Sequence, residues 1–500
     1  MKFLVYSEVN AATIETSLGL PEYSYYFVLR EFLPVLERLG EVIVVTEPHH
    51  EVDAHYRAAK AAGERCLFLS FSPPHRTTLG LECPTVPIFA WEFDSIPTQS
   101  WYDQPEHDWR HGLRLCGKAI THSALTVRTV GDALDTDFPV IAIPAPVWNK
   151  FESLRTAAAS APVPGGYSID VRSGVLFDTR DLSLQPWMPG LDAVAAAVAA
   201  ARGQSQAKAE PEPAPPSSPA PRASRLRVTL RYLAEWYRLV WRDSLPAPLI
   251  GLVERLRGKG HPPAVVASAA ATPWEPAPHR LKLEGVVFTA VFNPYDGRKN
   301  WVDMLTAFCS AFRDTADATL VFKLGHHEYR DAIEGMLMGL ARLPAFRCRV
   351  VILHGYLEKA AYESLIHATS YVVNASHGEG QCLPLMEYLS CGKPAVAPRH
   401  SAMADYIDED VAFVVDSWLD ATAWPHDPRL AYRTCRHQID WTSLVQAYTQ
   451  AYHCFKATPE TYAALSRNAI ERMRVHCSRQ SASERLVEFL RLEETAPCCP

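Results

Sequence analysis

The stretch SHGEGQCLPLMEYLSCGKPAVAP, residues 376–398, decides how the C-terminal half of this chain is interpreted. It continues the apolar run SYVVNAS (370–376), which is predicted to be a strand, and it carries two glutamates eight positions apart, Glu379 and Glu387. Open α/β sheets bind ligands just beyond the carboxyl ends of their strands. The stretch therefore lies where a ligand site is expected.

Local signals in this stretch predict a loop followed by a short helix. The glycines at 378 and 380 allow the backbone to approach a ligand closely. Pro384 suits the first turn of a helix, where its missing N–H is not needed, and Gly392 suits the end of that helix. Because the N-terminus of a helix has unsatisfied N–H groups and the positive end of the helix dipole, this one is suited to phosphate.

The charged residues near this helix indicate a ligand with both phosphate and hydroxyl groups. A carboxylate accepts two hydrogen bonds at once, which suits a pair of neighbouring hydroxyls, and Glu379 and Glu387 are expected to face one cavity. The turn FNPYDGRKN (292–300) brings Arg298 and Lys299 to the end of another strand, where they can neutralise phosphate. We therefore expect a nucleotide-sugar, with one acid for the sugar and one for the ribose.

The C-terminal half resembles glycosyltransferase family 4, a group of retaining enzymes with the GT-B fold. The signature of that family is similar to EGFGLPxLEAMAxGxPV, and this chain has EGQCLPLMEYLSCGKPAV (379–396) with the spacing of the two glutamates intact. The preceding segment 350–376 fits the turn, helix and strand that lead to those acids. The likeness spans about 285–480.

This resemblance implies roles for individual residues. Glu379 would contact hydroxyls of the donor sugar, Glu387 would bind the ribose and Lys299 would hold the diphosphate. The family usually has an arginine in a turn before that lysine; here Asn293 stands in its place, and Arg298 is the candidate to replace it. Four backbone amides would line the donor pocket: those of Gly380, Gln381, Cys382 and Leu383.

The first 150 residues alternate apolar strands with helix-like segments such as 25–40, which predicts a parallel sheet covered on both faces. Within them, Gly19 resembles the glycine that approaches the donor in the family, although it also suits an ordinary turn. The segment FAWEFDSIP (89–97) stands where many relatives have a catalytic histidine. Its Trp91 and Glu92 are expected to face the cleft or, equally, to be a core and a surface residue. Ser123 is a further candidate, in a strand-to-helix turn.

The whole chain of 500 residues is too long for one ordinary core, and it is expected to form two doubly wound, Rossmann-like domains that face a cleft. The predicted strands are 2–6, 42–45, 66–71, 86–91, 119–121 and 139–144 in the first half, and 285–292, 318–324, 349–356, 370–376 and 394–398 in the second. The expected domains are 1–150 on the acceptor side, an insertion at 151–280, a donor-binding domain at 281–480, and a C-terminal helix and tail at 481–500.

The insertion is rich in Ala, Pro and Ser, with six prolines between Pro211 and Pro221, and it is expected to be a long, partly disordered linker. Inside it, residues 224–243 show helical spacing of apolar residues opposite a stripe of arginines. This helix is expected to lie on an anionic membrane surface or, equally, to dock on the protein's own domains.

Composition excludes several classes of protein. The chain has 49 basic and 56 acidic side chains, a net charge of −7, which gives no reason to expect nucleic acid as a partner. Its 12 cysteines do not form zinc-binding clusters, and no DxD-like metal motif is persuasive, so neither a metal nor a cofactor is expected. Without a signal peptide or an apolar stretch long enough to span a bilayer, the chain is expected in the cytoplasm, with possible contact to the inner face of the membrane. No strand–GxGxxG–helix supports an NAD-dependent dehydrogenase.

Together these features predict a GT-B glycosyltransferase that transfers a hexose from a nucleotide-diphosphate sugar to a glycan or a lipid-linked acceptor, with retention of configuration. The candidate catalytic residues are Glu379, Lys299, Arg298 and Glu92. The alternative is a catalytically silent binding or scaffold protein of the same fold, which the missing histidine of the N-terminal half favours.

Overall fold

The computed structural model describes residues 1–188 and 274–491, except residues 12, 18, 20, 21, 102, 135 and 158–165. The proline-rich tract at 211–221 and the amphipathic segment 224–243 lie outside the described residues. The expected contact of that segment with a membrane therefore stays a prediction.

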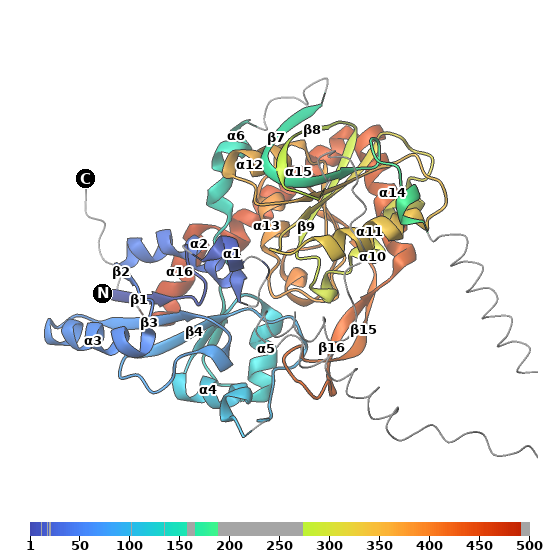
Figure 1. The fold of residues 1–500 in the computed structure, drawn as a ribbon. Coiled ribbons are helices and arrows are strands. Elements are labelled where there is room, and N and C mark those ends of the chain that lie inside the picture. The colour runs from blue at the N-terminus through green and yellow to red at the C-terminus, as the bar shows by residue number, and fades with distance from the viewer. Residues whose placement is uncertain are drawn as a thin grey trace, which may run out of the picture. The chain divides into compact units, whose positions relative to one another are not determined.

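The N-terminal residues form a six-stranded parallel sheet in the order β2-β1-β3-β4-β5-β6, as the alternation of strands and helices predicts (Figure 1). Its strands are β1 (Lys2–Tyr6), β2 (Glu41–Val44), β3 (Cys66–Phe71), β4 (Thr85–Phe89), β5 (Ala119–Thr121) and β6 (Val140–Ala142). Its helices are α1 (Ile14–Ser17), α2 (Tyr23–Leu39), α3 (Pro48–Ala61), α4 (Trp109–Cys116) and α5 (Ala124–Ala133). Helix α2 ends at Leu39 and is followed by the C-cap residue Gly40, where the helical pattern in the sequence also ends.

The C-terminal residues form an eight-stranded sheet in the order β14-β13-β12-β9-β10-β11-β7-β8. Its parallel strands are β9 (Val286–Phe292), β10 (Ala318–Leu324), β11 (Arg349–His354), β12 (Tyr371–Val373), β13 (Ala395–Pro398) and β14 (Ala412–Val415). The helices between them are α10 (Trp301–Ala311), α11 (Arg330–Ala341), α12 (Lys359–Ala368) and α13 (Leu383–Ser390). Every residue of β10 and β11 is buried, as expected for central strands of a sheet covered on both faces.

Part of the stretch 151–280 is folded, which differs from the expectation of a flexible linker over that range. After α6 (Glu152–Ala157), strand β7 (Tyr167–Asp178) pairs antiparallel with β11 and with β8 (Ala277–Leu283). A buried ion pair between Asp178 and Arg349, 2.5 Å apart, fixes β7 to the sheet. Strand β7 lies between β11 and the edge strand β8, but β8 lies about a hundred residues later in the chain, so local sequence does not reveal the pair.

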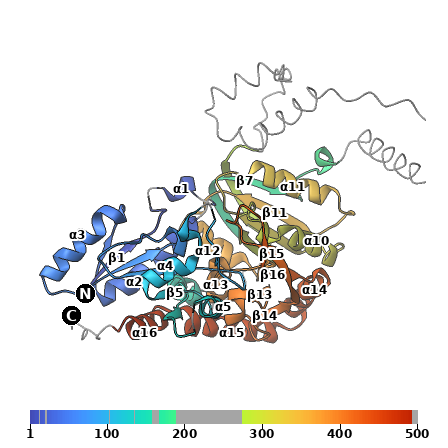
Figure 2. The same ribbon diagram turned by 90° about the horizontal axis from the view of Figure 1, so that it is seen from below.

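Three helices end the described chain: α14 (Trp441–Ala457), α15 (Pro459–Cys477) and α16 (Arg479–Leu490). They follow one another from the second sheet to the first (Figure 2), where α16 packs against α2. The Arg65 guanidinium donates to the carbonyl oxygens of Leu490 and Arg491. Helix α16 starts at 479, two residues before the expected boundary. Its buried residues belong to a hydrophobic core that includes residues of both sheets.

A hairpin that the sequence analysis does not predict connects the two sheets at another point. Strands β15 (Ser417–Ala423) and β16 (Tyr432–Ile439) form a separate two-stranded sheet. The Asp94 carboxylate accepts hydrogen bonds from the backbone N–H of Cys435 (2.7 Å) and the hydroxyl of Thr434 (2.9 Å). The hairpin therefore holds the segment that follows β4.

Among the described helices, none combines the length and the apolar composition needed to cross a bilayer.

Candidate active site

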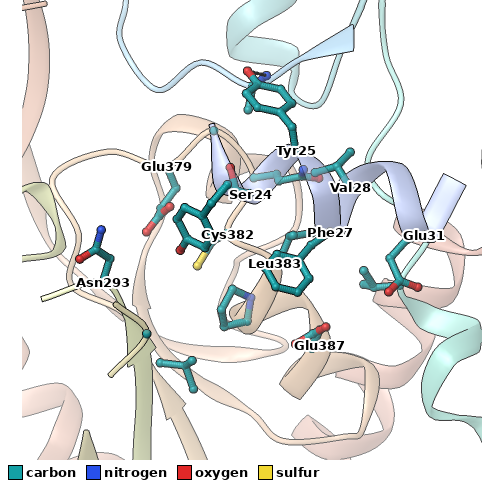
Figure 3. Close-up of a pocket in the computed structure, with 18 of the residues that line it drawn as sticks. Ser24, Tyr25, Phe27, Val28, Glu31, Asn293, Glu379, Cys382, Leu383 and Glu387 are labelled. Atoms are coloured by element: carbon teal, nitrogen blue, oxygen red, sulfur yellow. Dashed lines mark hydrogen bonds between the residues drawn. The ribbon is translucent and has the colours of Figure 1, made fainter. Parts of the chain in front are cut away.

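A cavity of about 1010 Å³ lies where connecting segments of the two sheets meet (Figure 3). Residues 90–92 follow β4, Asn293 to Lys299 follow β9, and Glu379 to Leu383 follow β12, and all three segments contribute to its lining. Both predicted glutamates, Glu379 and Glu387, line the same cavity. The expectation that the two acids face one cavity is therefore met.

Glu379 accepts hydrogen bonds from four side chains. The Lys299 ammonium lies 2.7 and 2.9 Å from its two carboxylate oxygens, and the Arg298 guanidinium lies 3.0 Å from Oε2. The Ser376 hydroxyl (2.7 Å) and the Asn374 amide (3.1 Å) donate to Oε1. Glu379 is 2% exposed, so this carboxylate is both buried and saturated with donors.

The cations decide the charge state of Glu379. Burial alone raises the pKa of a carboxyl, but Lys299 and Arg298 outweigh burial and hold the pKa of Glu379 well below its ordinary value. The carboxylate is thus ionised at neutral pH. Burial opposes the charge on Arg298, yet Glu92 and Glu379 raise the pKa of its guanidinium further.

Arg298 also joins the N-terminal segment to this cluster. Its Nε lies 3.2 Å from the Glu92 carboxylate and 3.0 Å from Asp296, and its Nη1 donates to the Gly378 carbonyl oxygen. Of the two alternatives for Glu92, a residue of the cleft or a surface residue, the structure therefore supports the first. Burial raises the pKa of Glu92, although Arg298 opposes the effect.

Glu387 binds a different cation from the one that holds Glu379. The Lys150 ammonium lies 2.5 Å from its Oε1, and the Tyr362 hydroxyl donates to its Oε2 at 2.6 Å. Lys150 follows β6 in the N-terminal half and also approaches Glu31 of α2 at 3.7 Å. The carboxylate of Glu387 keeps acceptor positions for a further donor, because it has room for about four hydrogen bonds.

The glycines near the site allow the two halves of the chain to approach each other. A Cβ on Gly380 would lie 2.7 Å from Ala90 Cβ, and one on Gly378 would lie 3.0 Å from the Glu92 carbonyl oxygen. Gly19 has a positive φ of 85° and packs against His326, and its carbonyl oxygen accepts from the Asn293 amide at 2.9 Å. Gly19 is thus held beside the position where the resemblance expects an arginine, and its contact with a donor stays a prediction.

The remaining predicted binding residues form the loop and the start of α13. Gln381 is buried, and its side-chain oxygen accepts from the Ala145 N–H at 3.1 Å. Cys382 precedes α13 with a φ of 60° and makes no side-chain cap, and Leu383 begins the helix. The first N–H groups of α13 therefore have no side-chain cap on the wall of the cavity, which suits the expected phosphate.

Two other candidates of the N-terminal half have structural roles. The Ser123 hydroxyl accepts from the Thr126 N–H and caps α5. Trp91 lines the cavity, but its indole donates to the Ser95 carbonyl oxygen at 2.8 Å and its ring packs on Trp109, 4.4 Å away between centroids. Both readings of Trp91, as a core residue and as a residue of the cleft, are thus correct.

Several residues that line the cavity belong to no sequence motif that would mark them as site residues. They are Lys150, Tyr362, Lys323, His75 and His426. The rings of His75 and His426 stack 5.1 Å apart, although they come from segments 351 positions apart in the chain (426 minus 75). Tyr362 lies in the helix that the family likeness covers, and only the spatial arrangement shows its contact with Glu387.

Within residues 1–188 and 274–491, the described side chains include no group of three or more His, Cys, Asp or Glu placed to hold a metal ion. The expectation that the reaction needs no metal stays a prediction.

Comparison with known proteins identifies the fold. Residues 285–424 match the family model described as Glycosyl transferases group 1, and no curated protein matches the chain. A glycosyltransferase from Rickettsia africae ESF-5 has a similar structure, with a TM-score of 0.50, 9% identity and 99% of each chain covered. The likeness to this structure confirms the expected GT-B fold.

Two further solved structures have lower TM-scores. HepE from Anabaena, solved with UDP and glucose, has a TM-score of 0.48 and 12% identity over 98% of this chain and 99% of that chain. Sucrose-phosphate synthase from Thermosynechococcus elongatus has a TM-score of 0.46 and 12% identity over 98% of each chain.

Proposed function

We propose that the protein is a glycosyltransferase that transfers a hexose from a nucleoside-diphosphate sugar to a glycan or a lipid-linked acceptor, with retention of configuration. The observation that carries the proposal is the convergence of Glu379, Lys299 and Arg298 in one cavity with Glu387. The match of residues 285–424 to a glycosyltransferase family model supports the same class of activity.

In this proposal the diphosphate binds between the two cations and the start of α13. The Lys299 ammonium and the Arg298 guanidinium stabilise the charge that develops on the leaving phosphate. When they turn toward phosphate, they release acceptor positions on Glu379, which then bind hydroxyls of the donor sugar. Glu387, held in place by Lys150 and Tyr362, accepts from the ribose hydroxyls.

Glu92 is a carboxylate of the N-terminal half that contacts the cluster around Glu379 through Arg298. Its carboxylate contacts Arg298, and burial raises its pKa toward the range in which a carboxylate accepts a proton effectively. We assign it the acceptor side of the reaction, where it orients the attacking hydroxyl or accepts its proton.

The ribose role of Glu387 is tested by calorimetric titration of UDP and GDP into the wild-type protein and a Glu387→Ala variant. Loss of a hydrogen bond to a charged group costs about 1.5–3 kcal/mol, so the dissociation constant of the nucleotide that binds should rise about 10- to 100-fold. Glu363→Ala is the matched control, because this glutamate also lines the cavity but pairs with Lys359 of its own helix. Unchanged affinity of Glu387→Ala would remove the ribose role.

Turnover separates the enzyme from the silent binding protein. Wild-type protein should hydrolyse or transfer from a nucleotide-sugar, with and without added membranes, and Glu379→Gln should lose most of this turnover. Nucleotide binding without any turnover across a panel of UDP- and GDP-sugars would favour the silent binding protein. Full activity of Glu379→Gln would exclude this residue from the reaction.

A further inference from the structure

Lys323 is a buried cation that no part of the proposed mechanism uses. It lies near the end of β10 and is 6% exposed, and it lines the cavity that contains both glutamates. The strand register places it opposite Val291 of β9 and Leu353 of β11, so the three side chains share one face of the sheet. Since Val291 also lines the cavity, Lys323 lies on the face of the sheet that the ligand would meet.

Lys323 differs from the other cations described above in its lack of a carboxylate partner. Lys299 pairs with Glu379, Arg298 pairs with Glu92 and Glu379, and Lys150 pairs with Glu387. Among the described residues, no carboxylate forms an ion pair with Lys323. Its ammonium donates to the carbonyl oxygen of Leu324, the next residue, at 2.8 Å.

An unpaired ammonium inside a protein is costly, because burial removes its hydration without offering an opposite charge. Burial accordingly lowers the pKa of Lys323 to about 8. A hydrophobic residue at this position would cost less, and the β10 strand is otherwise apolar apart from Thr319. A buried ammonium without a carboxylate partner on the wall of a cavity is a candidate to bind an anionic ligand.

We propose that Lys323 binds a phosphate group of a nucleoside diphosphate in this cavity, an assignment that rests on the proposed function. Lys299, Arg298 and Lys150 are each paired with a carboxylate, so Lys323 offers a buried positive charge that an incoming ligand can use without breaking an ion pair. An ammonium forms strong, charge-assisted hydrogen bonds with phosphate oxygens. The start of α13, at Leu383 and Pro384, lines the same cavity and favours the same negative charge.

The test compares Lys323→Met with Lys393→Met in calorimetric titrations of UDP, GDP, uridine and guanosine. Lys393 is the matched control, because burial lowers its pKa to about 8 as well and its ammonium donates to the His367 carbonyl oxygen, but it does not line the cavity. We expect Lys323→Met to weaken binding of the nucleoside diphosphate at least tenfold and to leave the nucleoside unchanged. Lys393→Met should bind both as the wild type does.

Thermal unfolding provides a second readout. Because Lys323→Met removes an unpaired buried charge, the variant should unfold at the same temperature as the wild type or at a higher one, which a merely structural lysine would not show. If Lys323→Met instead unfolds at a lower temperature, the same titrations are made with Lys323→Gln, because glutamine keeps a polar group at the end of the side chain.

The outcomes separate this assignment from the proposed function. Wild-type affinity for UDP and GDP in the folded Lys323 variant would overturn the role of Lys323 and leave the glycosyltransferase proposal intact. An equal loss of affinity for uridine and UDP, or for guanosine and GDP, would place Lys323 at the nucleoside and overturn the phosphate role. Wild-type protein that binds neither UDP nor GDP would overturn the proposed function together with the assignment.

Discussion

At the scale of single residues, Gly380 shows how closely the two halves of the chain approach each other. A methyl group at this position would lie 2.7 Å from Ala90 Cβ and 3.1 Å from the Trp91 nitrogen, both in the opposite half of the chain. The backbone must therefore shift to admit a side chain. We expect Gly380→Ala to lower the free energy of unfolding by about 1–3 kcal/mol, the usual cost of overpacking, and to lower turnover as well.

Gly131→Ala is the control for this experiment. Gly131 lies inside α5, where the nearest heavy atom to an added Cβ is 4.0 Å away, and alanine favours a helix by about 1 kcal/mol. The control should unfold at the wild-type temperature or slightly above it. A Gly380→Ala variant that is as stable and active as Gly131→Ala would show that the two halves do not need this contact.

Residue spacing explains why part of the site is predictable from sequence. Glu379 and Glu387 belong to one loop and helix, and Arg298 and Lys299 to one turn, so local pattern places each pair at the end of a strand. The partners of Glu387 behave differently. Lys150 is 237 positions away from it along the chain, and no local pattern marks that lysine. Its contact depends on how the two halves pack, which the sequence pattern does not specify.

At the scale of elements, the β15–β16 hairpin positions the segment that carries Glu92. The Asp94 carboxylate accepts from Cys435 and Thr434 of β16, and the indole of Trp424 donates to the Ser95 carbonyl oxygen. Removing Asp94 should loosen this segment and leave the Lys299 side of the cavity in place. We expect Asp94→Ala to lower kcat about tenfold, because the two hydrogen bonds that this charged group accepts are lost. The dissociation constant of the nucleotide should stay within about twofold of wild type, because the Lys299 side of the cavity keeps its contacts.

Asp420→Ala is the matched control, because Asp420 is an exposed residue of the same hairpin that lies on β15. Both constants should stay at their wild-type values in this variant. A parallel loss of nucleotide binding and turnover in Asp94→Ala would show that the hairpin supports the whole site and not the N-terminal segment alone.

The sequence correctly predicts the strands that alternate with helices along the chain. The parallel strands from β1 to β6 and from β9 to β13 are short apolar runs between helical segments, and the sequence predicts each of them close to its observed bounds. Strand β7 is not predicted, because it belongs to an Ala- and Pro-rich stretch and pairs with β8, which lies far along the chain. The β15–β16 hairpin has mostly exposed or partly exposed residues and therefore lacks the apolar pattern of a core strand.

At the scale of the whole molecule, five histidines among the residues that the structure describes have strongly lowered pKa values. Burial is the main cause in each, and the pKa values are about 3 for His75, His400 and His476 and about 4 for His122 and His426. Neighbouring positive or histidine groups add to the effect at most of these positions. All five are therefore neutral in the folded protein at pH 5.

The sign of the resulting pH dependence follows from proton binding. Between pH 6.5 and about 4, the unfolded chain protonates these histidines and the folded protein does not, so the stability that they contribute near neutral pH is lost as the pH falls. Glu22 acts in the opposite direction, because burial raises its pKa to about 7 and the folded protein takes up its proton first. Burial also raises the pKa values of Glu92 and Asp405, so three carboxyls oppose the five histidines, and we expect the more numerous histidines to determine the sign.

We therefore expect the apparent unfolding temperature to fall steadily from pH 7.5 to pH 5, as measured by circular dichroism in buffers of equal ionic strength. His426→Gln should make this fall less steep, because one of the five groups no longer titrates, whereas His111→Gln, at an exposed position, should follow the wild-type curve. His426 stacks on His75 and Trp109 of the N-terminal half, so the burial that keeps His426 neutral depends on the packing between the two halves. An unfolding temperature that is constant or rises on acidification would mean that these histidines reach water in the folded protein, and the tight packing between the halves would then be wrong.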